Sequence, residues 1–158
     1  MIGEIGDGEM ALRLGLATLL GALLGVDREL RGYAAGIRTH SLVALSACVA
    51  SMSALMLYHG LHAEGSQADP LRVIQGLAQA IGFLCAGLIF VRSGDVRNMT
   101  TAANLWMAAT LGIAIGLGHY VLVAIASLIA LVMLTAVRVF ERRFLGSRGE
   151  DEENGEKS

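Results

Sequence analysis

The chain has 158 residues, of which 54% are hydrophobic and 16% charged, with a mean hydropathy of +0.60. Its 12 Lys and Arg residues nearly balance its 14 Asp and Glu residues, so the formal net charge is -2. This composition lies outside the usual mix of a soluble domain. We therefore expect an integral membrane protein without a nucleic-acid partner.

The charged residues are strongly segregated along the chain. None of residues 73–91 and none of residues 99–137 is Asp, Glu, Lys or Arg. A hydrocarbon core about 30 Å thick needs roughly 17–25 apolar helical residues per crossing. We predict an all-α integral membrane protein with a compact bundle of five transmembrane helices. The predicted spans are residues 10–26, 41–58, 73–91, 102–118 and 120–137.

The first predicted span contains one charged residue. Arg13 lies near its start and can extend to the lipid headgroups. Acidic rather than basic residues precede the span, namely Glu4, Asp7 and Glu9, and no small-residue cleavage site follows it. This pattern argues against a cleaved signal peptide.

The connection between the first two spans carries a cluster of five charged residues, Asp27, Arg28, Glu29, Arg31 and Arg38. Counted over all connections, one face of the five-span topology holds ten Lys and Arg residues, and the other holds only Arg13 and Arg72. Cytoplasmic segments retain positive charge. We expect the N-terminus outside, the C-terminus inside, and anionic lipids at the cytoplasmic face.

Helix punctuation supports the later boundaries. Asp69 followed by Pro70 predicts the start of the third span, and Asn98, Thr100 or Thr101 can cap the fourth. The second span ends before His59, His62 and Glu64, which could bind a divalent metal or simply form a solvated loop. The acidic tail, residues 146–158, is expected to be disordered.

Small residues recur every fourth position in four of the spans, which lets helix backbones approach closely. The pattern fits packing within one bundle, and it also fits a homodimer interface. Cys48 and Cys85 fall within spans and are expected to be buried thiols. The small residues are Ala17, Gly21 and Gly25, then Ser46, Ala50 and Ala54, then Ala78, Gly82 and Ala86, and lastly Ala108, Gly112 and Gly116; Gly87 is a further candidate packing glycine.

The acidic residues of the predicted cytoplasmic face have two possible uses. Asp27, Glu29 and Asp95 could offer oxygen ligands to Mg²⁺, or they could pair with the surrounding arginines. We expect Arg38 to bind one of these carboxylates in bidentate fashion, with Thr39 capping the second span. The candidate functional residues of this face are Asp27, Arg28, Glu29, Arg38, Thr39, Asp95, Thr100, Thr101 and Asn104.

The spans themselves contain few polar groups. Gln75, Gln79 and Asn104 are expected to form hydrogen bonds between helices. A transport path normally needs ionisable groups near the midplane, which the spans lack. Hydrolase, nucleotide-binding and metalloprotease motifs are also absent from the sequence. We expect neither enzymatic activity nor a cofactor.

Two stretches nevertheless resemble a known family. "GVDRELRGYAAGIRTHSLVALSA" and "GFLCAGLIFVRSGDVRNMTTAANLW" are similar to the ordered motifs of the MgtC/SapB family of bacterial inner-membrane proteins, over about residues 20–118. Asp27 stands where the family usually has Glu, Cys85 where it has Gly, and Asn98 and Met99 where it has Gly and Leu. The matching positions are Gly25, Arg28, Glu29, Ala35, Gly36, Arg38, Thr39, Gly82, Phe83, Gly87, Ile89, Thr100, Thr101, Ala102, Ala103, Leu105 and Trp106.

The resemblance implies a role in adaptation to low magnesium, acid or host environments, and several members of the family are linked to virulence. We expect an MgtC/SapB-like transmembrane domain over residues 1–145, followed by the tail. Longer members carry a cytosolic C-terminal domain that we do not expect here. We expect a non-enzymatic protein that modulates a membrane partner through its arginine-rich cytoplasmic face. A small Mg²⁺ or other cation transporter is the alternative, and an isolated lipid-binding module is a third possibility.

Overall fold

The computed structural model describes residues 5–63, 69, 71–92 and 95–144. The side chains of residues 61–63, 90–95 and 137–144 are not described. The chain divides into two parts, residues 1–124 and residues 125–158, and each is described by itself. The expected disorder of residues 146–158 lies outside the described residues.

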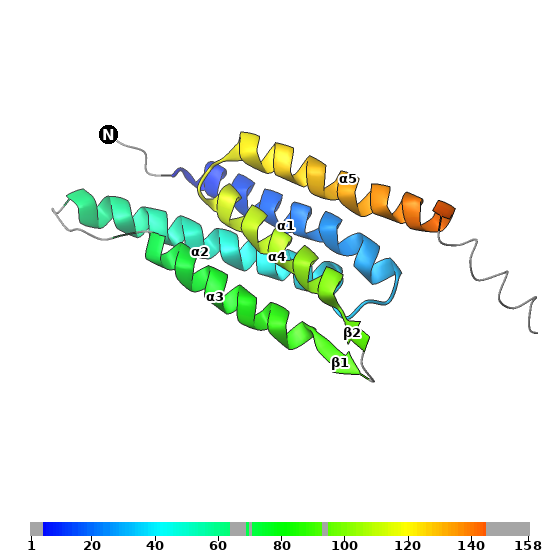
Figure 1. The fold of residues 1–158 in the computed structure, drawn as a ribbon. Coiled ribbons are helices and arrows are strands. Elements are labelled where there is room, and N and C mark those ends of the chain that lie inside the picture. Colours follow the sequence, from blue (N-terminus) through cyan, green and yellow to red (C-terminus); the bar gives the residue numbers. More distant parts are fainter. Residues whose placement is uncertain (1–4, 64–68, 70, 93–94, 145–158) are drawn as a thin grey trace, which may run out of the picture. The chain divides into compact units, whose positions relative to one another are not determined.

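Five helices and one short hairpin make up the described chain (Figure 1). Four helical stretches are long and apolar enough to cross a membrane, which confirms a multi-pass helical protein. The described apolar stretch of α5, Tyr120–Ala136, is shorter, so the fifth span stays a prediction. The elements are α1 (Asp7–Leu30), α2 (Ile37–Ala63), α3 (Leu71–Leu88), β1 (Phe90–Arg92), β2 (Asp95–Arg97), α4 (Met99–Gly116) and α5 (Tyr120–Phe144).

The hairpin of β1 and β2 lies between α3 and α4, where the sequence predicts helix up to residue 91. The strands are antiparallel, with Phe90 opposite Arg97 and Arg92 opposite Asp95. Asn98 follows in the left-handed conformation, at φ 65°, and its Nδ2 donates to the Leu88 carbonyl at 3.1 Å. The side chain of Asn98, one of the three residues predicted as possible caps of α4, therefore closes the end of α3 instead, and α4 has no side-chain cap hydrogen bond.

The core of residues 1–124 forms around α2, which packs extensively against both α1 and α4 (Figure 1). α3 packs mainly against α4. Backbones meet directly at two glycines of α1: a Cβ on Gly21 would lie 2.6 Å from the His40 carbonyl oxygen, and one on Gly25 would lie 2.7 Å from the Ile37 Cα. Gly112 and Gly116 of α4 meet the backbone of α2 in the same way. The close approach explains how short side chains fill this interior.

The small-residue pattern fails on α2 and weakens on α3. Ser46 is exposed, and the buried residues of α2 include Ala44, Ala47 and Cys48 instead. The reason is that α2 packs on two sides, so no single seam of small residues marks its contacts. On α3, a Cβ at Gly82 would touch Trp106 at 3.4 Å, and one at Gly87 would meet no described atom within 4 Å. Gly87 is therefore not at a helix contact in the described chain.

Capping agrees with the sequence at α3 and differs at α2. The Asp69 carboxylate accepts a hydrogen bond from the Leu71 N–H at 2.9 Å, which confirms the predicted start of α3. α2 begins at Ile37, two residues before Thr39, and the Gly36 carbonyl accepts the His40 N–H at 3.1 Å. Thr39 thus lies within the first turn, and its expected capping role is wrong.

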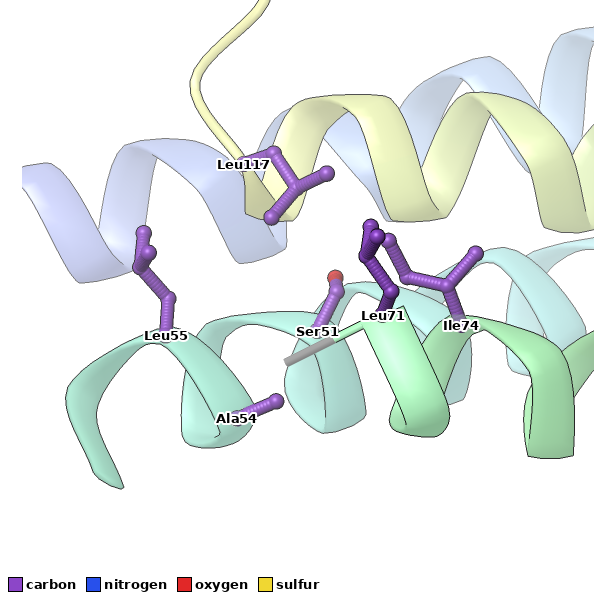
Figure 2. A pocket seen from close by; sticks show the side chains of 6 residues that line it. All are labelled: Ser51, Ala54, Leu55, Leu71, Ile74 and Leu117. Atoms are coloured by element: carbon purple, nitrogen blue, oxygen red, sulfur yellow. The ribbon is translucent and has the colours of Figure 1, made fainter. Parts of the chain in front are cut away.

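An apolar cavity of about 120 Å³ lies where α2, α3 and the end of α4 meet. Figure 2 shows the side chains around it. Its one polar side chain, Ser51, donates a hydrogen bond to the Ala47 carbonyl at 2.8 Å. Such a lining offers no set of convergent polar groups to orient a ligand. The lining residues are Ser51, Ala54, Leu55, Leu71, Ile74 and Leu117.

Candidate functional site

Most of the candidate residues lie at one end of residues 1–124, where α1 ends and α2 and α4 begin. We call this the arginine-rich end and define it by residues 24–40 and 96–104. Asp95 belongs to β2, just before α4, and its side chain is outside the described residues. The candidates that the arginine-rich end brings together are Asp27, Arg28, Glu29, Arg38, Thr39, Thr100, Thr101 and Asn104.

Glu29 caps the second helix from a distance in sequence. Its Oε2 accepts a hydrogen bond from the Ile37 N–H at 3.0 Å, at the start of α2. A carboxylate at this position satisfies a free N–H and complements the positive end of the helix dipole. A Cβ on Gly36 would collide with the same carboxylate. Glu29 and Gly36 therefore act as a pair that sets the turn between α1 and α2.

Asp27 pairs with Arg31, and the pairing expected for Arg38 is not seen. The Arg31 Nε lies 3.0 Å from Asp27 Oδ1, one helical turn away. Arg38 is exposed, and the described side chains include no ion pair with it. The prediction of a bidentate contact from Arg38 to Asp27 or Glu29 is wrong, because these two carboxylates are engaged by Arg31 and by the N-terminus of α2.

Arg28 is the unusual cation of this end. Its residue is only 7% exposed, its Nη1 lies 3.2 Å from the Thr100 hydroxyl, and its guanidinium stands over the Tyr33 ring at 4.8 Å. Among the described residues its buried Nε has no hydrogen-bond partner, and neither has the buried hydroxyl of Thr101. A buried arginine held by a hydroxyl and an aromatic ring retains its full charge with no described carboxylate beside it.

His40 and Asn104 link three helices through buried hydrogen bonds. The Asn104 Nδ2 donates to the Leu24 carbonyl of α1 at 2.9 Å and lies 3.2 Å from the His40 Nε2 of α2. The other ring nitrogen, Nδ1, lies 2.8 Å from the Gly36 carbonyl. This geometry fits a neutral ring that donates from Nδ1 and accepts at Nε2. Asn104 thus makes the expected hydrogen bonds between helices.

Sequence reasoning passed over His40, although it is fully buried. Its position at the start of an apolar helix was a signal, because a histidine that is buried there needs hydrogen-bond partners. Its partner on α4 lies 64 residues away, and this separation hides the pair from any local pattern.

The opposite end of residues 1–124 has its own polar cluster around Arg13. The Nη1 of Arg13 donates to the Gly116 carbonyl at 2.7 Å, and its Nε lies 2.8 Å from Glu9 Oε1 and 3.2 Å from the Tyr120 hydroxyl. The Tyr120 hydroxyl also donates to Glu9. A cation at the last carbonyls of α4 complements the helix dipole. Arg13 therefore binds protein groups, in contrast to its expected extension to the headgroups.

The metal site suggested at His59, His62 and Glu64 cannot be assembled from the described chain. The His62 side chain and all of Glu64 lie outside the described residues. Within the part that is described, no three His, Cys, Asp or Glu side chains gather in a group suited to a metal ion.

Comparison with known proteins agrees with the motifs at the arginine-rich end. The model of the MgtC family matches residues 14–143, which is most of the chain. The chain belongs to the MgtC family. It is 37% identical over 116 residues to Protein SapB from Bacillus subtilis, covering 72% of this chain and 50% of the relative. It is 39% identical over 109 residues to Protein MgtC from Salmonella typhimurium strain LT2, covering 69% and 44%.

Protein SrpB from Synechococcus elongatus is 36% identical over 146 residues, covering 84% of this chain and 77% of the relative. The chain spans about half the length of SapB and MgtC. No solved structure matches it.

Several positions that this MgtC-family chain shares with the family motifs have a physical reason in the structure. Gly25 lies against the backbone of Gly36 and Ile37, and Gly36 in turn makes room for Glu29. Gly25 and Gly36 thus allow the close contact between the end of α1 and the start of α2. Cys85 departs from the motif; it is buried, and its thiol donates to the Ala102 carbonyl at 3.3 Å.

Proposed function

We propose that this MgtC-family chain is a non-enzymatic protein of the bacterial inner membrane that modulates a membrane partner during adaptation to low magnesium or stress. It acts through the arginine-rich end, which faces the cytoplasm in a five-span topology with the N-terminus outside and the C-terminus inside. The ten-to-two distribution of Lys and Arg over the two faces supports this orientation.

The proposal rests on the contacts that the acidic residues of the arginine-rich end already make. Asp27 pairs with Arg31 and Glu29 caps α2, so each carboxylate already has a structural contact, and the described residues form no group of three suited to a metal ion. Arg31 and Arg38 are exposed at the same end. The end therefore presents cationic groups to its surroundings, and such a surface suits an acidic patch on a partner or anionic lipids.

The alternative is a small transporter of Mg²⁺ or another cation. Such a protein would need a polar path through the helices. The buried polar groups at His40 and Asn104 are bonded to one another and to the Leu24 and Gly36 carbonyls. The glycine contacts of α1 and α4 with α2 leave little space beside them. Both observations favour the modulator over the transporter.

One preparation of the full chain can separate the two functions. We expect affinity purification from native membranes in a mild detergent to yield a stoichiometric complex with another membrane protein. Liposomes reconstituted with the chain alone should take up Mg²⁺ no faster than empty liposomes. Chemical cross-linking of the same sample would show whether the retained partner is a second copy. Protein-dependent Mg²⁺ flux without a retained partner would establish the transporter instead.

A further inference from the structure

We propose that Arg28 and the first turn of α4 form a binding site for a phosphate group, supplied by a phospholipid headgroup or by soluble phosphate. The inference goes beyond the proposed function and holds whether or not the protein modulates a partner. It rests on two independent features that meet at Thr100: a buried cation and a helix N-terminus without a side-chain cap.

The cation is Arg28, whose residue is 7% exposed. Burying a guanidinium is unfavourable unless an opposite charge or a full set of acceptors compensates it. Its described contacts, the Thr100 hydroxyl at 3.2 Å and the Tyr33 ring at 4.8 Å, are both uncharged. Its Nε has no hydrogen-bond partner among the described residues. An anion beside the guanidinium, on the side where Nη1 contacts Thr100, would compensate the charge.

The uncapped N-terminus belongs to α4, which has 18 residues. The Ala102 N–H donates to the Asn98 carbonyl at 2.9 Å, so the N–H groups of Met99, Thr100 and Thr101 precede the first α-helical bond. Asn98 gives its side chain to the end of α3, and α4 has no described side-chain cap. These N–H groups and the helix dipole attract an anion.

The two features face one another because Arg28 Nη1 contacts the hydroxyl of Thr100 in that first turn. Met99 and Thr100 are exposed, so a ligand can reach the N–H groups from outside. A phosphate has enough oxygens to accept from N–H groups of the helix, from the Thr100 hydroxyl and from a planar guanidinium at once. The position at the end of four membrane-length helices also matches the level of lipid headgroups.

The acidic residues at the end of α1 do not compensate the charge of Arg28. Asp27 is paired with Arg31, and Glu29 bonds the N-terminus of α2. The side chain of Asp95 lies outside the described residues. It is therefore the competing anion that the experiment must address.

The test uses the full chain in maltoside micelles freed of phospholipid, titrated with inorganic phosphate at constant ionic strength. Thermal unfolding should shift upward saturably with phosphate and not with chloride. Thr100→Val, an exposed change that preserves shape, should weaken phosphate binding about tenfold, because it removes a hydrogen bond to a charged group. Arg28→Lys should weaken it at least as much, because an ammonium lacks the planar fork.

Two control variants decide what the result means. Arg31→Gln removes an equal charge from the same end and should leave phosphate binding within about twofold, apart from general screening. Asp95→Asn should also leave it within about twofold. Equal shifts with phosphate and chloride would overturn the proposal, and so would unchanged binding in Thr100→Val. A tenfold gain in Asp95→Asn would show that the chain's own carboxylate occupies the place.

The source of the phosphate is distinguished by a second arm of the experiment. Native mass spectrometry of protein extracted with its lipids should show anionic phospholipid retained by the wild type and lost from Thr100→Val if a headgroup is the natural ligand. Saturable binding of inorganic phosphate in the lipid-free micelles, without lipid retention in this arm, would assign the site to a soluble phosphate. Absence of both would overturn the inference.

Discussion

Replacing Gly21 by alanine tests the direct contact between the backbones of α1 and α2. The added Cβ would lie 2.6 Å from the His40 carbonyl oxygen and 2.8 Å from the Ser41 Cα, whereas ordinary van der Waals contact begins at 3.4 Å. The obstructing atoms belong to backbone, which cannot rotate away as a side chain can. The two helices must therefore separate by about 0.8 Å at this point, and a gap of that size weakens neighbouring dispersion contacts.

The expected cost follows from overpacking. Inserting a methyl group into a tightly packed site costs about 1–3 kcal/mol, and the gain in helix propensity from glycine to alanine offsets at most about 1 kcal/mol of it. Gly15 provides a matched control on the same helix, because a Cβ there would meet nothing within 4 Å. Gly15→Ala should be neutral or stabilising by up to about 1 kcal/mol.

The measurement is the free energy of unfolding in mixed micelles of maltoside and sodium dodecyl sulfate. Trp106, the one tryptophan of the sequence, reports the transition by fluorescence, and far-UV circular dichroism confirms it. Gly21→Ala should unfold at a clearly lower fraction of dodecyl sulfate than Gly15→Ala. Equal stability of the two variants would refute the backbone contact and the account of the core built on it.

Two further predictions concern the buried pair of His40 and Asn104 and the membrane topology. Replacing either His40 or Asn104 by leucine should destabilise the protein by about 1–3 kcal/mol, because a buried partner is left unpaired. The double variant should be destabilised by less than the sum of the two single variants. Strict additivity in the same unfolding assay would count against the hydrogen bond. Reporter proteins fused after Phe144 and within residues 60–66 should lie on opposite faces of the membrane, the first in the cytoplasm, so two fusions on one face would exclude the five-span topology.

Much of the helical framework could be predicted from the sequence because membrane spans are set by length and hydropathy alone. The predicted start at Asp69 holds since a capping acid is a local signal. The hairpin after Leu88 was missed, since the apolar run continues to residue 91 and hydropathy does not distinguish helix from strand. Its three-residue strands are too short to show any alternation.

The charges drew attention to the arginine-rich end, but they did not predict which residues pair there. Charge alone suggested that Arg38 would find a carboxylate. The structure instead couples Asp27 to Arg31 and Glu29 to the N-terminus of α2. The second contact depends on the turn at residues 31–36, where Gly32 adopts a φ of 68°. The burial of Arg28 depends on α4, which is remote in sequence. Neither contact leaves a periodic pattern.

The residues of the arginine-rich end divide into those that hold the helices together and those that remain available to a ligand or partner. Glu29, Gly36 and His40 belong to the first kind, since Glu29 caps α2, Gly36 leaves room for Glu29, and His40 bonds Asn104 of α4. Loss of activity on changing them would therefore report misfolding as readily as function. Thr100 belongs to the second kind, because it is an exposed residue whose hydroxyl adjoins Arg28 at the start of α4. A variant there can lose activity while the helices keep their stability, so it gives the clearer measure of what this end does.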